Sequence, residues 1–123
     1  MVIRKQSGNP VNYDLCRQTV TVYHKEGSGY TRKVYRRAFL HFEKSQTVGK
    51  TGQEEKTGFL LVIPGDVQTV FAGDKIMEGE GPVITSPQEW REFIPDNVPG
   101  LVKASSAETY SWDGKIIHTE ARG

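Results

Sequence analysis

The sequence predicts a mainly β fold: a small β-barrel or sandwich of six to eight short strands, with one short capped helix and a long polar loop. Two observations predict it. The chain of 123 residues holds 13 glycines and 6 prolines, which favour many turns between short elements. Several stretches are rich in β-branched residues and alternate apolar with polar side chains, which is the two-residue period of a strand. A chain of this length corresponds to a single domain, residues 1–123, whose core needs no disulfide.

The first strands follow a lead-in. We expect residues 1–12, which include Gly8-Asn9-Pro10, to form a loosely packed tail. Residues 18–24 alternate β-branched and polar side chains as a strand does, and Glu26-Gly27-Ser28-Gly29 has the composition of a turn. A strongly basic strand is expected next, over residues 30–37.

Two apolar stretches flank a polar one. The pattern leaves open whether residues 38–42 continue the basic strand or follow a bend at Arg36-Arg37. Residues 59–63 form an unbroken apolar run, which is typical of a central strand buried on both faces. Between these stretches, residues 44–57 hold one apolar residue, Val48, so burial cannot offset the ordering entropy of the segment. The sequence therefore predicts a long mobile loop over residues 44–57.

One helix is signalled clearly. Ser86-Pro87-Gln88-Glu89 combines a capping box with a proline at the first helical position. Trp90, Phe93 and Ile94 have the i, i+3, i+4 spacing of a buried stripe. Pro95 ends the helix after about two turns, because a residue before proline avoids the α conformation.

The remaining elements are short strands. Residues 67–71 and 75–77 are expected as two of them, each bounded by Gly-Asp turns. The chain closes with a hairpin, in which Tyr110-Ser111-Trp112 and residues 115–118 flank an Asp113-Gly114 turn of type I′.

The motifs that resemble enzyme or metal sites are incomplete. Gly49-Lys50-Thr51 resembles the end of a phosphate-binding loop, but the glycine required five residues earlier is Lys44. His41-Phe42-Glu43 and His118-Thr119-Glu120 match a fragment of zinc deaminases, which also need two cysteines where this chain has Cys16 alone. We therefore predict no catalytic, cofactor-binding or metal-binding residue, and histidines held by neighbours on their strands.

Composition bears on location as well. No apolar run approaches the ~18 residues of a membrane helix, and residues 1–6 lack the apolar segment of a secretory signal. Cys16 cannot form an internal disulfide, which favours a reducing compartment and a small buried core residue. We expect no membrane partner.

The total charge conceals an asymmetry along the chain. The 16 Lys+Arg and 15 Asp+Glu residues nearly cancel, to +1. Residues 1–50, however, hold ten basic and three acidic residues, a net charge of +7, and residues 51–123 hold six basic and twelve acidic, a net charge of −6. Such a chain can stack head to tail, or present a basic face to phosphates, unless its charges interleave in space.

A basic, tyrosine-rich strand favours one of two functions. Tyr23, Tyr30 and Tyr35 interleave with four cations that form a candidate basic face: Arg32, Lys33, Arg36 and Arg37. Aromatic side chains and cations on one strand face are typical of barrels that bind single-stranded nucleic acid. A small nucleic-acid-binding β-barrel is therefore the alternative function.

The other function comes from a resemblance. Several motifs of the chain, taken together, resemble those of small proteins from the head–tail region of tailed phages and prophages. We associate those proteins with minor capsid or head-closure (stopper) components. The residues that carry it are Thr19-Val20-Thr21-Val22-Tyr23, Gly73-Asp74-Lys75-Ile76, Gly79-Glu80-Gly81-Pro82, Trp90, Phe93-Ile94-Pro95, Val98-Pro99-Gly100-Leu101-Val102, the Trp112 hairpin and His118-Thr119-Glu120-Ala121.

The resemblance implies a non-enzymatic virion protein, without a cofactor, assembled in the cytoplasm of a bacterial host. It would form a homo-oligomeric ring on a template, between the portal or adaptor and the tail proteins. Proteins similar to these carry a loop that narrows or closes the DNA channel, a part that residues 44–57 would take here. The candidate channel residues are Ser45, Thr47, Val48, Lys50, Thr51 and Lys56. Contact with packaged DNA and the position in the connector stay open, and the C-terminal hairpin and capped helix depart from a simple six-stranded stopper barrel.

Overall fold

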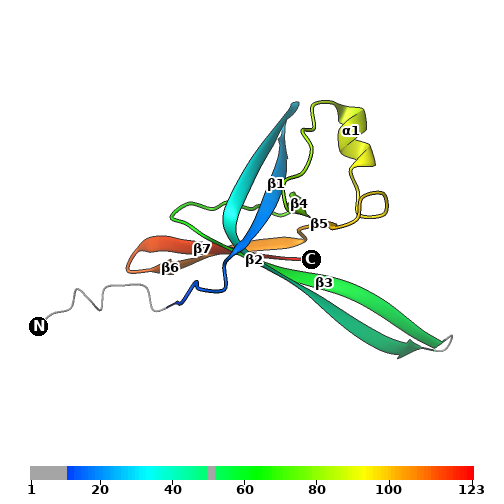
Figure 1. The fold of residues 1–123 in the computed structure, drawn as a ribbon, viewed down its shortest axis with the longest axis horizontal. Coiled ribbons are helices and arrows are strands. Elements are labelled where there is room, and N and C mark those ends of the chain that lie inside the picture. Colours follow the sequence, from blue (N-terminus) through cyan, green and yellow to red (C-terminus); the bar gives the residue numbers. More distant parts are fainter. Residues whose placement is uncertain (1–10, 50–51) are drawn as a thin grey trace, which may run out of the picture.

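The computed structural model describes residues 11–49 and 52–123. In this part of the chain, seven antiparallel strands form one sheet that curls into a half-barrel, with one short helix beside it (Figure 1). The strand order in the sheet is β5-β4-β1-β2-β3-β7-β6. The predicted mainly β fold with one short helix is therefore confirmed. The elements are β1 (Gln18–Glu26), β2 (Gly29–Gly49), β3 (Gly52–Pro64), β4 (Lys75–Glu78), α1 (Pro87–Glu92), β5 (Leu101–Lys103), β6 (Ser106–Trp112) and β7 (Lys115–Arg122).

Strand β2 joins the two parts of the sheet without interruption. Its first part pairs with β1, and from Phe39 onward it pairs with β3. The register with β1 shifts between Val20↔Tyr35 and Gln18↔Ala38, so β2 has one extra residue there, a β-bulge at Arg36-Arg37. The two stretches that the sequence left open are thus one long strand with a bulge.

The predicted loop over residues 44–57 is wrong. The β2–β3 ladder continues from Lys44↔Thr57 to Gly49↔Gly52, so both sides of the segment are strands. We call these residues, 44–49 and 52–57, the β2–β3 arm; it extends away from the rest of the sheet (Figure 1). Low apolar content did not prevent strand formation, because the backbone bonds of the ladder need no buried side chain.

Residues 67–71, predicted as a strand, are also irregular. Other groups satisfy their backbone: the Thr69 N–H donates to Thr119 Oγ1 at 3.1 Å, and the Gln68 side-chain amide donates to the Val70 carbonyl at 2.9 Å. The neighbouring prediction is confirmed, since residues 75–77 lie in β4. Of the tail predicted over residues 1–12, residues 1–10 lie outside the described residues. Tyr13, the first residue after it, contacts His118 of β7.

Two hydrophobic clusters lie on opposite faces of β1. The larger one, inside the curl of the sheet, consists of Val20, Val22, Ala38, Leu40, Phe59, Leu61, Ile63, Val70, Ile76, Ala104 and Ala121. The smaller one consists of Tyr23, Ile84, Phe93 and Leu101. Four consecutive residues of β1, from Val20 to Tyr23, are consequently buried. Burial on both faces makes β1 the central strand of the core.

Helix α1 begins as the capping box predicts. The Glu89 N–H donates to Ser86 Oγ at 3.1 Å, and Pro87 opens the helix. The Glu89 carboxylate accepts from the Thr85 N–H at 3.1 Å and the Thr85 hydroxyl at 2.9 Å, one residue before the expected partner. These bonds hold the pKa of Glu89 below its ordinary value. The expected buried stripe is carried chiefly by Phe93, which follows the helix, and Trp90 is half-buried.

The two-residue turns follow from their sequences. Asp113 and Gly114 have φ values of 55° and 78°, so the β6–β7 hairpin has the predicted type I′ turn. Gly27 opens the β1–β2 turn at φ 59°, a conformation that glycine adopts without strain.

Replacing Phe93 with alanine should destabilise the fold by about 3–5 kcal/mol, because the ring is buried against Tyr23 with centroids 4.7 Å apart. Val83→Ala is the matched control: Val83 is exposed, and its truncation should change the free energy of unfolding by less than ~0.5 kcal/mol. Urea denaturation of both variants measures the difference. Equal losses would contradict the second hydrophobic cluster.

Candidate functional site

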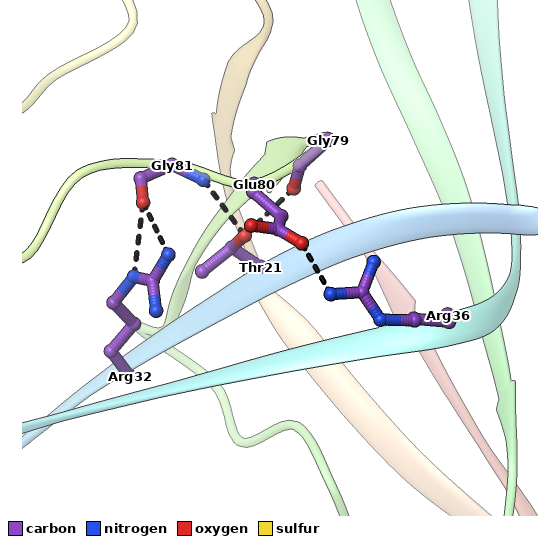
Figure 2. Close-up of polar contacts among 6 residues, drawn as sticks. All are labelled: Thr21, Arg32, Arg36, Gly79, Glu80 and Gly81. Atoms are coloured by element: carbon purple, nitrogen blue, oxygen red, sulfur yellow. Dashed lines mark hydrogen bonds and ion pairs between the residues drawn. The ribbon is translucent and has the colours of Figure 1, made fainter.

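The predicted basic face is divided by contacts within the chain. Figure 2 shows the loop from Gly79 to Gly81 lying over β1 and β2, where Arg32 points at it. The Arg32 guanidinium donates from Nε at 3.0 Å and from Nη2 at 2.6 Å to the Gly81 carbonyl. Arg36 forms an ion pair with Glu80 of the same loop. Two of the four cations therefore hold a loop of their own chain.

Thr21 fixes the same loop from the buried side. Its hydroxyl donates to the Gly79 carbonyl at 2.7 Å and accepts from the Gly81 N–H at 3.0 Å (Figure 2). Thr21 is fully buried, and this one side chain satisfies two backbone groups, the buried Gly81 N–H and the half-buried Gly79 carbonyl. Its place in the strand explains why a polar residue interrupts an otherwise apolar stretch.

In the Gly79-Glu80-Gly81-Pro82 motif, steric contacts explain why residue 81 is glycine. A Cβ atom at Gly81 would collide with the Tyr23 hydroxyl and press on the Met77 sulfur. That hydroxyl donates to the Pro82 carbonyl at 2.6 Å, and burial raises the pKa of Tyr23 above its ordinary value. Glycine lets the loop approach β1 closely enough for these bonds.

Lys33 lies on the other face of β2. It lines a cleft of about 360 Å³ in the half-barrel together with His24, Tyr35 and Phe71. Arg37 is exposed at the bulge. Arg32 and Lys33 are consecutive strand residues, so their side chains leave opposite faces of the sheet. The four predicted cations do not share one face.

Within this cleft, a buried carboxylate positions a histidine, an arrangement that the sequence analysis missed. Asp74 is 2% exposed; its Oδ1 lies 2.5 Å from His24 Nδ1, and its Oδ2 accepts from the Phe71 N–H at 2.9 Å. Since a carboxylate only accepts, His24 Nδ1 carries the proton of this bond. The signal in the sequence is the Gly73-Asp74 turn, but its partner lies 50 residues away.

A second histidine is held by its neighbours, as predicted. His118 is buried; its Nε2 lies 2.9 Å from Glu120 Oε2, and its Nδ1 lies 2.6 Å from the Tyr13 hydroxyl. The Glu120 carboxylate can only accept, so Nε2 carries a hydrogen and donates it in this bond. In the neutral ring Nδ1 then carries no hydrogen, and it accepts from the Tyr13 hydroxyl. Tyr110 stacks on this histidine, with ring centroids 4.8 Å apart, and the Glu120 carboxylate raises the pKa of Tyr110. The cluster ties the lead-in to β7.

The other candidate chemical groups are structural or ungrouped. Cys16 is a buried core residue, as predicted, and burial raises the pKa of its thiol, which disfavours the reactive thiolate. Among residues 11–49 and 52–123, no group of three or more His, Cys, Asp or Glu side chains could hold a metal ion. His41, the third histidine, is exposed on β2.

The candidate channel residues are distributed over both strands of the β2–β3 arm. In the ladder, Ser45 pairs with Lys56, and Thr47 and Val48 pair with Glu54 and Gln53. Lys50 and Thr51 lie outside the described residues. The arm's strands pair with each other, and β7 first pairs with β3 at Leu60, beyond the arm.

No family model, curated protein or solved structure matches the chain. In the described part of the chain, no helix has the length and apolar character needed to cross a membrane.

Thr21→Val should cost about 1–3 kcal/mol of folding free energy, because the buried Gly81 N–H and the half-buried Gly79 carbonyl lose their partner. Arg36→Ala, which removes an exposed ion pair to the same loop, should cost less than ~1 kcal/mol. Chemical denaturation compares them. A larger loss for Arg36→Ala would show that the loop is held from the surface instead.

Proposed function

We propose that the chain is a non-enzymatic structural protomer of a phage head–tail connector, which forms a ring between portal and tail and uses the β2–β3 arm to contact neighbouring subunits. The observation that carries this proposal is the arm itself. Among the described residues, its two strands pair with each other and with no further strand. A two-stranded ribbon is marginally stable by itself in water, so an arm of this kind gains most from contacts outside its own chain.

The composition of the arm fits such contacts. Residues 44–57 are almost entirely polar, with Val48 as the single apolar residue. A polar arm remains soluble before assembly and forms hydrogen bonds and ion pairs afterwards. The resemblance to head–tail proteins gives these contacts a setting: a ring around a DNA channel.

Nucleic-acid binding by the basic strand is the weaker proposal. Arg32 and Arg36 bond to the Gly79–Gly81 loop, and Lys33 lies on the opposite face from Arg32. A backbone-tracking groove needs its cations on one surface. We therefore give the connector function precedence.

Replacing residues 44–57 with Asn-Gly tests the proposal, because Glu43 and Gly58 are cross-strand partners that a two-residue turn can join. The shortened protein should keep its thermal midpoint within a few degrees, since the described core clusters use other residues. It should fail to complete a ring on an assembly of phage portal and adaptor proteins.

Negative-stain microscopy of the mixed proteins provides the measurement, and Leu15→Ala, an exposed residue of the lead-in, is the control that should leave the ring unchanged. If full-length protein does not bind the portal assembly, or if the shortened protein binds equally well, the proposal is wrong.

A further inference from the structure

Outside the β2–β3 arm and the three-residue end strand β5, two longer strand stretches of the described chain have one open side. β6 is an end strand of the sheet, and residues 30–37 of β2 pair with β1 before β3 begins to pair at Phe39. In an antiparallel ladder, every second residue directs its N–H and C=O groups away from the partner strand. In the described part of the chain, these outward groups of both stretches have no strand beside them. The stretches are similar in length: β6 has seven residues.

The open stretch of β2 is strongly basic. It carries Arg32, Lys33, Arg36 and Arg37 and no acidic residue. Arg32 and Arg36 are engaged with the Gly79–Gly81 loop. Lys33 and Arg37 are exposed, and neither forms an ion pair with a described residue. Two cations thus remain for an outside partner.

The open stretch of β6 is acidic and carries an electrostatic conflict. Its single charged residue, Glu108, lies directly opposite Glu120 of β7, and like charges at such positions destabilise a sheet. His118 and Arg122 both bond to Glu120 rather than to Glu108. Glu108 is exposed and forms no ion pair with a described residue. A cation on an added strand would relieve the repulsion.

β6 also lacks two of the features that keep edge strands apart. It contains neither lysine nor proline, whereas many exposed edges carry one of these to prevent pairing with another chain. Its register with β7 shifts between Tyr110 and Ser111, so the regular edge that could accept a strand runs from Ser106 to Tyr110.

We propose that β6 of one copy of the chain adds to the open stretch of β2 of the next copy, so that Glu108 joins a strand that carries Lys33 on one face and Arg37 on the other. The occupant is a second copy because the two open edges of one chain complement each other in charge and length. Since the two edges differ, the contact is head to tail, and each added copy leaves the same two edges free for the next. Repetition gives a ring or a filament. This pairing rests on the proposed function and names the surface that would join the protomers.

Charge reversal on each edge tests the pairing. The first variant is Lys33→Glu with Arg37→Glu, and the second is Glu108→Lys. Sedimentation velocity at low salt measures self-association. Each variant alone should associate at least about tenfold more weakly than the unmodified protein, because like charges then meet across the contact. An equimolar mixture of the two should recover association, and so should the triple variant. Lys103→Glu, an exposed cation on β5, is the control that should change nothing.

The outcomes separate the pairing from the proposed function. If the unmodified protein associates but the mixture is no stronger than either variant alone, the pairing is wrong and the connector function stands. A contact between two β6 strands would instead leave the Lys33→Glu, Arg37→Glu variant as strongly associated as the unmodified protein, and that result would also make the pairing wrong. If the unmodified protein stays monomeric at every concentration and also on the portal assembly, both are wrong. Circular dichroism of each variant establishes that the fold is retained.

Discussion

The continuity of β2 is the constraint on which the rest of the structure depends. This one strand of 21 residues forms two ladders. Its pairing with β1 ends before its pairing with β3 begins. The bulge at Arg36-Arg37 makes that transition. Gln18 completes it: its side-chain amide donates to the Leu40 carbonyl at 3.2 Å and accepts from the Leu40 N–H at 2.9 Å, like one further rung of the β1 ladder. Beyond this point β2 is free to extend into the β2–β3 arm.

The same transition determines which surfaces are open. Because β1 is buried on both faces between two clusters, the β1–β2 hairpin is firmly anchored at its base. Within the described part of the chain, by contrast, its outer edge has no strand beside it until Phe39. An anchored strand with an open edge is a rigid platform for another chain. The arm and the open stretch of β2 thus follow from one feature, a strand longer than either of its partners.

Local signals in the sequence predicted the elements that depend on local chemistry. The Asp113-Gly114 turn and the Ser86 cap are set by backbone conformation and by bonds within a few residues, and both formed as expected. The strand expected at residues 67–71 failed because Thr119, 50 residues away, satisfies the Thr69 N–H. The loop expected over residues 44–57 failed for a related reason. Apolar content measures burial, and a ladder between two polar strands forms without it.

For the basic strand, the sequence predicted which residues are present but not which of them lie together. The sequence showed that residues 30–37 are basic, but the division of the cations depends on a loop that returns to β2 from Gly79–Gly81. Likewise, the Asp74–His24 pair joins residues whose strand neighbours give no hint of the contact. Side chains that meet through long-range topology have no spacing that a single sequence displays.

Amide hydrogen exchange, measured on the free protein and on the protein mixed with the proposed portal assembly, tests most directly whether the open strands are assembly surfaces. We expect slow exchange in Val20–Tyr23 in both states, because these residues are buried between two clusters. Amides of the arm, of β6 and of the open stretch of β2 should exchange quickly in the free protein and become protected on assembly. Equal protection of these strands in both states would contradict the role proposed for them.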